Sequence, residues 1–567
     1  MGLLCGLVAV AFHFAIHHLF EAVWHFAEGK SPLHFILTLL LAPTLGGLVV
    51  GLMVSKYAPE AGGSGIPQTK AAYYNKGGKI SIKTGIFRFI LGSLYVGLGN
   101  SLGREGPTVH ICTSISSRIG RSFFIDPVRI QSMAPVGMAA GIAAAFNAPL
   151  SALTFVFEEL LENFSMKALG GMVVAVVVAA AVSRTILGED PVLITSITED
   201  YTTSWWMLVA IPIGAFAGII GHSFVWSILN LRIWFNEKSK LPAWIRPASG
   251  GLSCGILALL AYYLTDLFGD ARNSVFSIGY DSLEAAFRNS LTIEILVILL
   301  VLKFIAVVIN YASGGSGGIF SPTLFIGGIL GAIMGIGFIN AQQMFVGVAE
   351  PMGDEVVGAC VLLGMGAMFA AVVRCPFTSL IIIFEMTGNY SLILPLMGGN
   401  MLAWTLAKWK QPQSIYTSLL LQDKITLKRM PTYRGAQDYR KLPVKAIMCH
   451  GAYKIRENET LGACLLRIKE DNKQYHAYPV VDVEGELVGV ITYHEIREFS
   501  TEKTVAEIIK EQKLLFIKDT TSIREAAALM VDRDFQQVPV VSEADTKHLL
   551  GWLTMNDIMR QQNAMEE

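Results

Sequence analysis

The sequence has few charged residues, and the shortage is confined to one part of the chain. Of its 567 residues only 16% are charged, against about 25% in an ordinary soluble protein. The last 144 residues hold 43 charged side chains, whereas the first 423 hold only 46. This distribution excludes a wholly soluble protein. It predicts a membrane domain over residues 1–423, a linker over 424–441 and a soluble domain after it.

Several features that indicate other classes of protein are also missing. A net charge of −1 offers no basic surface for nucleic acid. The seven cysteines form no CxxC pair, which predicts reduced apolar side chains rather than disulfides or a metal site. No HExxH motif is present to support a membrane metalloenzyme. The apolar segment from Met1 to Val10 carries no basic residues, so it predicts a first membrane helix rather than a cleaved signal peptide.

The membrane part contains an internal repeat. Residues 144–150 resemble residues 371–377, which lie 227 positions later, and residues 103–109 resemble 318–324, which lie 215 positions later. Short apolar segments interrupted by Gly and Pro at matching places of two halves indicate a transport site made of broken helices. The repeats are expected to span roughly residues 1–190 and 200–423, and repeats of this kind are often inverted.

The soluble part is repetitive as well. Two of its segments recur about 60 residues later, as expected of a duplicated small unit. The matching pairs are 478–482 with 538–542 and 489–495 with 551–557. Each unit predicts a helix, two apolar strands joined by a turn and a second helix, which makes this domain α+β. The expected repeats are 442–500 and 501–567.

Three segments of the membrane part share an unusual composition, namely Gly63–Pro67, Gly103–Pro107 and Gly317–Pro322. Their small residues allow the backbone to approach another group closely, and Pro suits the first turn of a helix. A helix that starts there directs free N–H groups and the positive end of its dipole at one point. Several such ends meeting within a membrane would bind an anion without a full positive charge.

These segments in this order, with Tyr416 near the end of the membrane part, resemble the CLC family of chloride channels and chloride/proton exchangers. The tail resembles the tandem CBS domains that many members carry. The resemblance implies an all-α polytopic membrane domain with two inverted repeats and broken helices, followed by an α+β tandem CBS domain.

The resemblance also implies a function and a setting. It implies a chloride/proton antiporter that is regulated by cytosolic CBS domains and dimerises through both its membrane and CBS domains. The partners would be chloride, protons and membrane lipid, with no required cofactor, in the plasma (inner) membrane of a prokaryote. Two alternatives remain open. One is a gated passive chloride channel of the same fold, and the other is a CBS-regulated divalent-cation transporter, which would need several inward carboxylates or carbonyls.

The resemblance implies an anion site around two hydroxyls, those of Ser64 and Tyr416, and the backbone N–H groups of Ile319 and Phe320. The full set of expected anion-binding residues is Gly63, Ser64, Gly65, Ile66, Pro67, Arg104, Gly106, Gly318, Ile319, Phe320 and Tyr416. A packing role for Ser64 and an interfacial role for Tyr416 are the structural alternatives.

Glu105 is the strongest candidate for a functional ionisable group. An ionisable side chain within a membrane is costly and marks function by default. At a helix N-terminus its carboxylate can occupy an anion site, and protonation would release it, so one group acts as gate and proton carrier. The equivalent residue of the second repeat is Phe320, which cannot titrate. The alternative role is a helix cap.

Two further glutamates follow in the first repeat. Glu158 is matched by Glu385, and such an equivalent pair is best explained by shared architecture, for example capping of a helix end. Glu159 is matched by Met386 and is therefore the better functional candidate. The family resemblance places Glu159 at the internal proton-transfer position of the exchangers. A solvated charge at a helix end is the alternative.

Three other features allow two interpretations each. His13, His17, Glu21 and His25, with His18 beside them, form a polar stripe that is either a metal-binding face or an interfacial face, and we expect no metal. Arg88 either adds positive potential near the pathway or extends to an interface.

In the tail, Thr554 and Asp557 resemble the ribose-binding end of nucleotide-binding CBS pairs, which implies one adenine-nucleotide site. The first repeat has Glu495 in place of the aspartate. A purely structural pair is the alternative.

Overall fold

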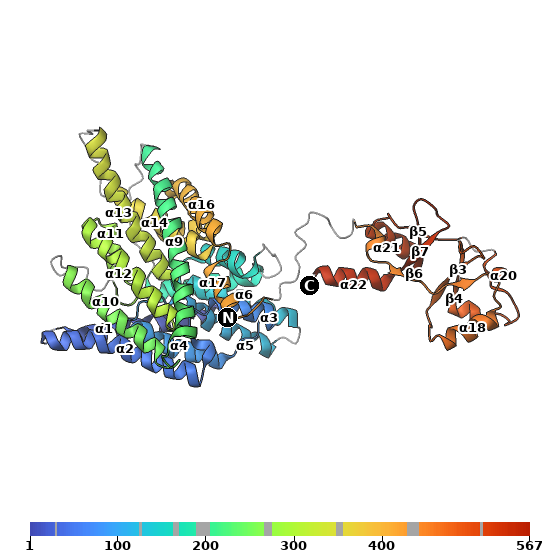
Figure 1. The fold of residues 1–567 in the computed structure, drawn as a ribbon, viewed down its shortest axis with the longest axis horizontal. Helices are drawn as coiled ribbons and strands as arrows, with labels where there is room; N and C mark the ends of the chain where they lie inside the picture. The colour runs from blue at the N-terminus through green and yellow to red at the C-terminus, as the bar shows by residue number, and fades with distance from the viewer. Residues whose placement is uncertain are drawn as a thin grey trace. The chain divides into compact units, whose positions relative to one another are not determined.

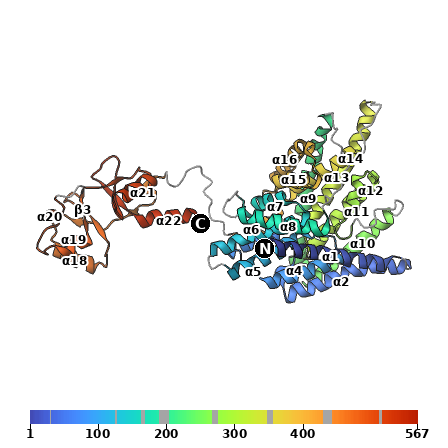
Figure 2. The same ribbon diagram turned by 180° about the vertical axis from the view of Figure 1, so that it is seen from behind.

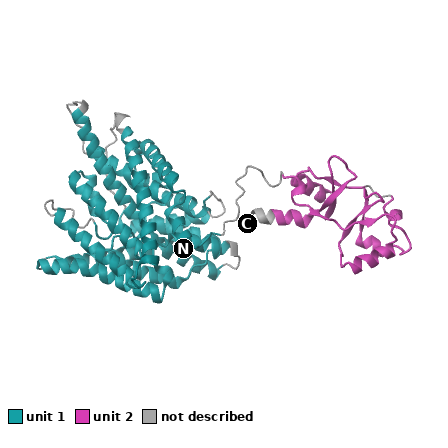
Figure 3. Cartoon of the chain, in the orientation of Figure 1, with its two compact units in different colours: residues 1–428 teal, residues 429–567 magenta. Residues whose placement is uncertain are grey.

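The structure is a computed structural model that describes residues 1–28, 31–123, 127–162, 169–188, 204–265, 275–346, 355–427, 442–510 and 514–566. The chain forms two compact units, residues 1–428 and 429–567 (Figure 3).

The described part of the first unit is built of helices (Figure 1). Eight of the described helices are long and apolar enough to cross a membrane. The first half contains α1 (Gly2–Ala27), α2 (Pro32–Lys56), α3 (Ile66–Asn75), α4 (Ile82–Gly97), α5 (Glu105–Phe123), α6 (Pro127–Phe146), α7 (Pro149–Phe155), the π-helical turn η2 (Val156–Leu161) and α8 (Leu169–Leu187). The second half contains α9 (Ala210–Ile233), α10 (Arg246–Thr265), α11 (Tyr280–Phe287), α12 (Ile293–Ala312), α13 (Phe320–Val346), α14 (Glu355–Val373), α15 (Pro376–Thr387) and α16 (Ile393–Lys410), followed by α17 (Ile415–Gln422).

The two halves meet at equivalent residues. Gly103 and Gly318 pair as an antiparallel bridge, and each donates its N–H to the other's carbonyl, at 2.7 and 2.6 Å. Antiparallel pairing of equivalent residues relates the halves by a local two-fold axis. Helices α5 and α13 begin directly after this bridge and extend to different sides of the unit (Figures 1 and 2). The prediction of two inverted repeats is confirmed.

Short helices that begin inside the unit break the spans, as the Gly- and Pro-rich segments predict. Helices α7 and α15 each start on a proline, which needs no N–H acceptor at the first position. Helices α3 and α11 each follow a glycine in the left-handed region, Gly65 with φ 96° and Gly279 with φ 87°. A side chain would strain the backbone there, so these glycines permit the sharp entry into both helices.

The second unit contains two sheets and the helices that cover them. Its elements are β1 (Cys449–His450), β2 (Ile455–Arg456), α18 (Leu461–Glu470), β3 (Ala477–Val481), β4 (Leu487–Thr492), α19 (Tyr493–Glu498), α20 (Val505–Ile509), β5 (Ile517–Lys518), α21 (Ile523–Asp532), β6 (Gln537–Val541), β7 (Leu549–Thr554) and α22 (Met555–Glu566). The strand orders are β2-β3-β4 and β1-β7-β6-β5.

The two sheets repeat one pattern. In each, a short parallel strand precedes a helix and pairs with the first strand of an antiparallel pair, β2 with β3 and β5 with β6. The register shifts at Val480/Val481 and again at Val540/Val541, which are equivalent positions. The α+β repeat is confirmed. The two-residue strands β2 and β5 are additions that are too short to produce a periodic sequence signal.

Candidate functional site

Ser64 lies in the turn before α3, wholly buried between two glycines. Its Oγ has no hydrogen-bond partner within the described residues. The first turn of α5 packs directly against Ser64. Gly106 lies so close that a Cβ on it would overlap the Ser64 Oγ. Ile66 and Pro67, which begin α3, are buried as well. A buried hydroxyl without a partner is costly unless something else binds it.

Arg88 holds this turn in place. Its guanidinium is fully buried and donates to the backbone carbonyls of Gly63 at 2.8 Å, Gly62 at 3.1 Å and Glu60. The interpretation of Arg88 as a side chain that extends to an interface is therefore wrong. Its donors satisfy carbonyls that the tight turn leaves without partners, and so it positions Ser64.

The Glu105 carboxylate lies at the N-terminus of α13. The residue is 1% exposed. Its carboxylate accepts hydrogen bonds from the Ser321 hydroxyl, from the Ser321 backbone N–H at 3.4 Å and from the Tyr280 hydroxyl at 3.4 Å. Arg104 Nε lies 3.9 Å from Glu105 Oε1. The side chain thus occupies a place where a helix dipole and free N–H groups favour an anion.

The hydroxyl of Tyr416, at the start of α17, is also buried and has no hydrogen-bond partner within the described residues. It lies within electrostatic range of Glu159 and Glu105. Ile319 and Phe320 lie where α13 begins, and the first N–H groups of a helix have no acceptor within it. The Phe320 ring packs on other aromatic rings, those of Phe146, Phe155 and Phe369. Only the backbone of Phe320 is therefore available to an ion.

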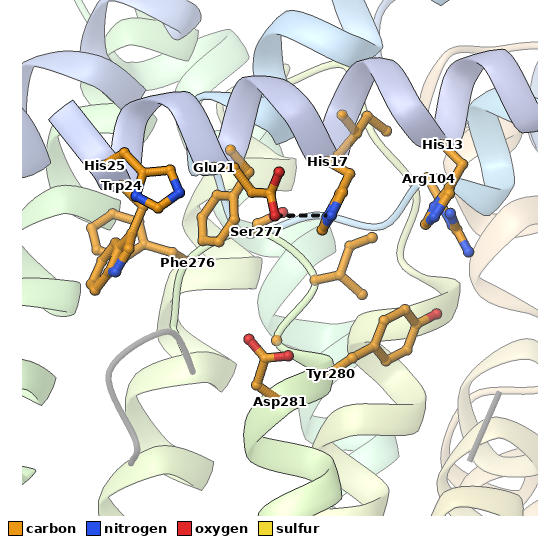
Figure 4. Close-up of a pocket in the computed structure, with 14 residues that line it drawn as sticks. His13, His17, Glu21, Trp24, His25, Arg104, Phe276, Ser277, Tyr280 and Asp281 are labelled. Atoms are coloured by element: carbon orange, nitrogen blue, oxygen red, sulfur yellow. Dashed lines mark ion pairs between the residues drawn. The ribbon is translucent and has the colours of Figure 1, made fainter. Parts of the chain in front are cut away.

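A pocket of about 410 Å³ lies between α1 and the segment that leads into α11 (Figure 4). Arg104 and Tyr280, which both contact Glu105, line it. Its other polar lining residues are His13, His17, Glu21, His25, Ser277 and Asp281. The predicted histidine stripe of α1 thus forms one wall of a pocket, with His17 Nε2 paired to Glu21 Oε1 at 3.1 Å. Within the described residues these side chains do not form a close group of three metal ligands.

Glu159 is not a solvated charge, since it lies within η2 and is 3% exposed. Lys70 of α3, which is 2% exposed, donates to Glu159 Oε1 at 2.8 Å and to Thr417 Oγ1 at 3.3 Å. The same ammonium lies 3.1 Å from Glu162 Oε1. Cys375 Sγ lies 3.9 Å from Glu159 Oε2. A buried ion-pair cluster therefore surrounds the predicted proton-transfer residue.

Glu158 and Glu385 cap two helices reciprocally. Glu385 of α15 caps the start of α7, and Glu158, which follows α7, caps the start of α15. The Glu385 carboxylate accepts the N–H groups of Leu150 and Ser151 at the start of α7, both at 2.7 Å. The Glu158 carboxylate accepts the N–H of Thr378 at 2.7 Å and that of its predecessor at 3.2 Å at the start of α15. The prediction that this matched pair has an architectural role is confirmed.

In the second unit Thr554 and Asp557 bind each other. The Asp557 carboxylate accepts the Thr554 N–H and hydroxyl at 3.0 and 2.7 Å, at the start of α22. Thr492 and Glu495 make the same contacts at the start of α19, both at 2.8 Å. A pocket of about 180 Å³ lies beside Thr554 and Asp557, and one of about 310 Å³ lies beside Thr492 and Glu495. The two repeats are therefore more alike than their sequences indicate.

Sequence reasoning missed Lys70, Glu162, Tyr280, Ser321 and Lys303. Lys303 is wholly buried and donates to the carbonyls of Val275 at 3.3 Å and Ser277 at 2.9 Å, before α11. It lies 215 residues after Arg88, so the repeat spacing itself could have identified it. The other four carry no such signal.

Comparison with known proteins agrees with this geometry. The pattern of the family "Voltage gated chloride channel" matches residues 46–408, and the CBS domain pattern matches residues 444–502 and 505–563. The H(+)/Cl(-) exchange transporter ClcA of Salmonella typhimurium is 31% identical over 441 residues, which cover 74% of this chain and 86% of that protein. The same transporter of Salmonella paratyphi A is also 31% identical, over 442 residues.

Solved structures show the same fold. A slow cyanobacterial Cl−/H+ antiporter is 26% identical, with a TM-score of 0.65 over 76% of this chain and 97% of that one. A eukaryotic CLC transporter, 18% identical, matches the fold with a TM-score of 0.61 over 98% of this chain and 96% of that one. The chain is a multi-pass membrane protein that belongs to the CLC, or voltage-gated chloride channel, family and carries a tandem pair of CBS domains.

Proposed function

We propose that this protein exchanges chloride for protons across a membrane. The observation that carries the proposal is the buried carboxylate of Glu105 at the N-terminus of α13, held by Ser321 and Tyr280. There a negatively charged side chain takes the place of an anion. When Glu105 is protonated it loses the charge that holds it, the side chain leaves, and chloride takes its position. One group then both opens the anion path and carries the proton.

The anion is bound next to Glu105 by groups without a full positive charge. The hydroxyls of Ser64 and Tyr416 are buried, have no partner within the described residues and are free to donate to it. The N–H groups of Ile319 and Phe320 supply the helix end. Gly65, Gly106 and Gly318 let these backbones approach, and Gly63 takes up the left-handed conformation of the turn. Arg104, which lies against Glu105, adds positive charge. Dipolar donors hold the ion loosely enough for its release.

Glu159 provides the proton from the opposite side of Glu105. Its burial next to Lys70 supports this role over that of a solvated surface charge. The gated passive channel is the second candidate, and the presence of a buried Glu159 favours exchange over it. The relatives named as exchangers favour the same choice. A divalent-cation transporter would present carboxylates or carbonyls at the breaks, whereas the breaks described above present N–H groups and hydroxyls.

The tail regulates this activity from the cytosol. The proposed organisation is a membrane domain over residues 1–423, a linker over 424–441 and CBS repeats over 442–500 and 501–567. The protein acts as a homodimer through both domains in the plasma membrane of a prokaryote and catalyses no chemical reaction. One adenine nucleotide binds beside Thr554 and Asp557, where Tyr453 and Trp552 line the pocket and offer rings to a base.

Chloride flux into proteoliposomes with simultaneous pH recording tests the exchange. An inward chloride gradient should drive protons outward against their own gradient in the unmodified protein. Glu105→Gln imitates the protonated state, so it should conduct chloride at both pH 5 and pH 7.5 without moving protons. Proton-coupled, pH-dependent transport that persists in Glu105→Gln and in Glu105→Ala would make Glu105 a structural cap and refute the mechanism.

A further inference from the structure

Three charged side chains, from α3, from η2 and from the residue that follows η2, form one cluster in the membrane unit. Lys70 of α3 lies with its Nζ 2.8 Å from Glu159 Oε1 and 3.1 Å from Glu162 Oε1. The third donor bond of the ammonium goes to Thr417 Oγ1, at 3.3 Å, next to the anion ligand Tyr416. Lys70 therefore connects the proposed proton-transfer residue with the helix that carries the anion-binding hydroxyl.

The cluster is unequally exposed to solvent. The side chain of Glu159 is 4% exposed and that of Lys70 is 3% exposed, whereas that of Glu162 is 28% exposed. Glu162 is therefore the member that water reaches, and Glu159 is the inner member. Two carboxylates and one ammonium carry a net charge of −1 when all are ionised, so the group can be neutralised by one proton.

The backbone is shaped to bring Glu162 to Lys70. Glu159 lies in the π-helical turn η2, and Glu162 follows that turn in the left-handed region, with φ 54°. Both features are uncommon for ordinary residues, and π turns occur frequently at functional sites. A non-glycine residue in this region is strained, and the ion pair with Lys70 offsets that strain.

The cluster lies on the face of the membrane unit where the chain leaves for the tail. Tyr74 of α3 donates to the carbonyl of Leu160, at 2.9 Å, and so joins α3 to η2. The next residue, Asn75, donates to the carbonyl of Thr426 at 2.9 Å, just before the chain leaves this unit. Solvent that reaches Glu162 is therefore solvent on the tail side of the membrane.

We propose that Lys70, Glu159 and Glu162 form the tail-side proton port of the exchanger, in which Glu162 takes up the proton and Lys70 positions both carboxylates. This inference rests on the proposed function, since it specifies how the proton reaches Glu159. A proton bonds first to a carboxylate oxygen of Glu162, which leaves Lys70 paired with Glu159. Transfer of that proton to Glu159 returns Glu162 to its charged form, paired with Lys70. The ammonium keeps its own three protons throughout.

Lys70 and Glu162 variants in the full chain test the port. Lys70→Met leaves two carboxylates without their cation, so the number of protons moved per chloride should fall roughly tenfold or more. Glu162→Gln removes the outer acceptor and should lower the same ratio while chloride flux persists. Lys70→Arg keeps the charge and should retain coupling. Chloride and proton fluxes are recorded together in proteoliposomes, at several values of tail-side pH.

Lys76→Met is the matched control. Lys76 follows the same helix and pairs with Glu60 at 2.8 Å, but both side chains are more than half exposed. Its coupling ratio should equal that of the unmodified protein. A merely structural role for Lys70 would lower both fluxes together and keep their ratio. Unchanged ratios in Lys70→Met or in Glu162→Gln would overturn the port, whereas absent coupling in the unmodified protein would overturn the exchange itself.

Discussion

The two halves of the membrane unit share their structural contacts, including two pairs of ionisable side chains, and differ in the carboxylates to which the proposed mechanism assigns protons. Gly103 and Gly318 pair with each other across the local two-fold axis. Arg88 and Lys303, 215 residues apart, are both buried and both bind the backbone carbonyls of the turn before a short helix. Side chains at matched positions build the scaffold.

The unmatched positions are those to which the proposed mechanism assigns protons. Glu105 of the first half corresponds to Phe320, whose ring lies in an aromatic cluster. Glu159 corresponds to Met386, while its neighbour Glu158 has the equivalent Glu385. In the proposed mechanism, a duplicated scaffold thus carries one proton path. The difference between the halves separates structural from functional carboxylates more clearly than burial does.

Removing a matched buried cation should have the largest effect. Arg88→Met and Lys303→Met each leave at least two carbonyls of a tight turn without a donor, which costs about 1–3 kcal/mol for each such group that is buried. Both variants should lose most of their folded protein, and Arg88→Met the more, since Arg88 binds three carbonyls and Lys303 two. Thermal unfolding and size-exclusion chromatography in detergent measure this. Unfolding temperatures equal to that of the unmodified protein would refute the positioning role.

Replacing Glu159 by methionine, the residue at the matching position 386 of the second half, should abolish proton transport. Glu159→Met and Glu159→Gln should retain chloride flux but lose uphill proton movement by roughly a hundredfold, the scale of a lost acid–base group. Simultaneous recordings of both fluxes show whether chloride flux persists when proton movement is lost. Undiminished uphill proton movement in either variant would show that Glu159 is not in the proton path.

Breaking the reciprocal caps should give two smaller effects of similar size. Glu158→Gln and Glu385→Gln each weaken charge-assisted bonds to two backbone N–H groups, which should cost about 1–2 kcal/mol. The number of protons moved per chloride should stay constant in both variants. A clear loss of coupling in only one of them would contradict the symmetry argument, and that carboxylate would then belong to the proton path.

The smallest effect is expected in the tail, where the two repeats can be compared in the same way. Asp557→Ala and Glu495→Ala remove equivalent helix caps, each worth about 1 kcal/mol. Only Asp557→Ala should weaken ATP binding, measured by calorimetry on the full-length protein. Equal affinities in the two variants and the unmodified protein would refute the ribose-binding role of Asp557.

Much of the fold could be predicted because the relevant residues lie in short local motifs. Gly and Pro at fixed spacing mark the helix starts around Ser64 and Glu105, and the 215-residue offset reveals the repeat. The matched pair Glu158 and Glu385 could be separated from Glu159 by comparing the halves of one sequence. These inferences use only local backbone preferences and internal symmetry.

The contacts of the candidate site could not be predicted, since they depend on tertiary packing. Lys70 meets Glu159 across 89 positions, and nothing in the local pattern of either residue specifies the other. Arg88 allowed two interpretations because its burial depends on the turn packed against it. The histidines of α1 do share one wall of a pocket, as their spacing predicts, but spacing alone could not show what lies opposite them.

The most direct test of Glu105 as the gate is to locate the anion in the Glu105→Gln variant. A structure of this variant in bromide, with the ion identified by its anomalous scattering, should show bromide at the Ser321 N–H in place of the carboxylate. A second bromide should lie against the Ser64 and Tyr416 hydroxyls. A glutamine side chain that stays on Ser321, with no bromide there, would contradict the claim that the Glu105 carboxylate occupies an anion site.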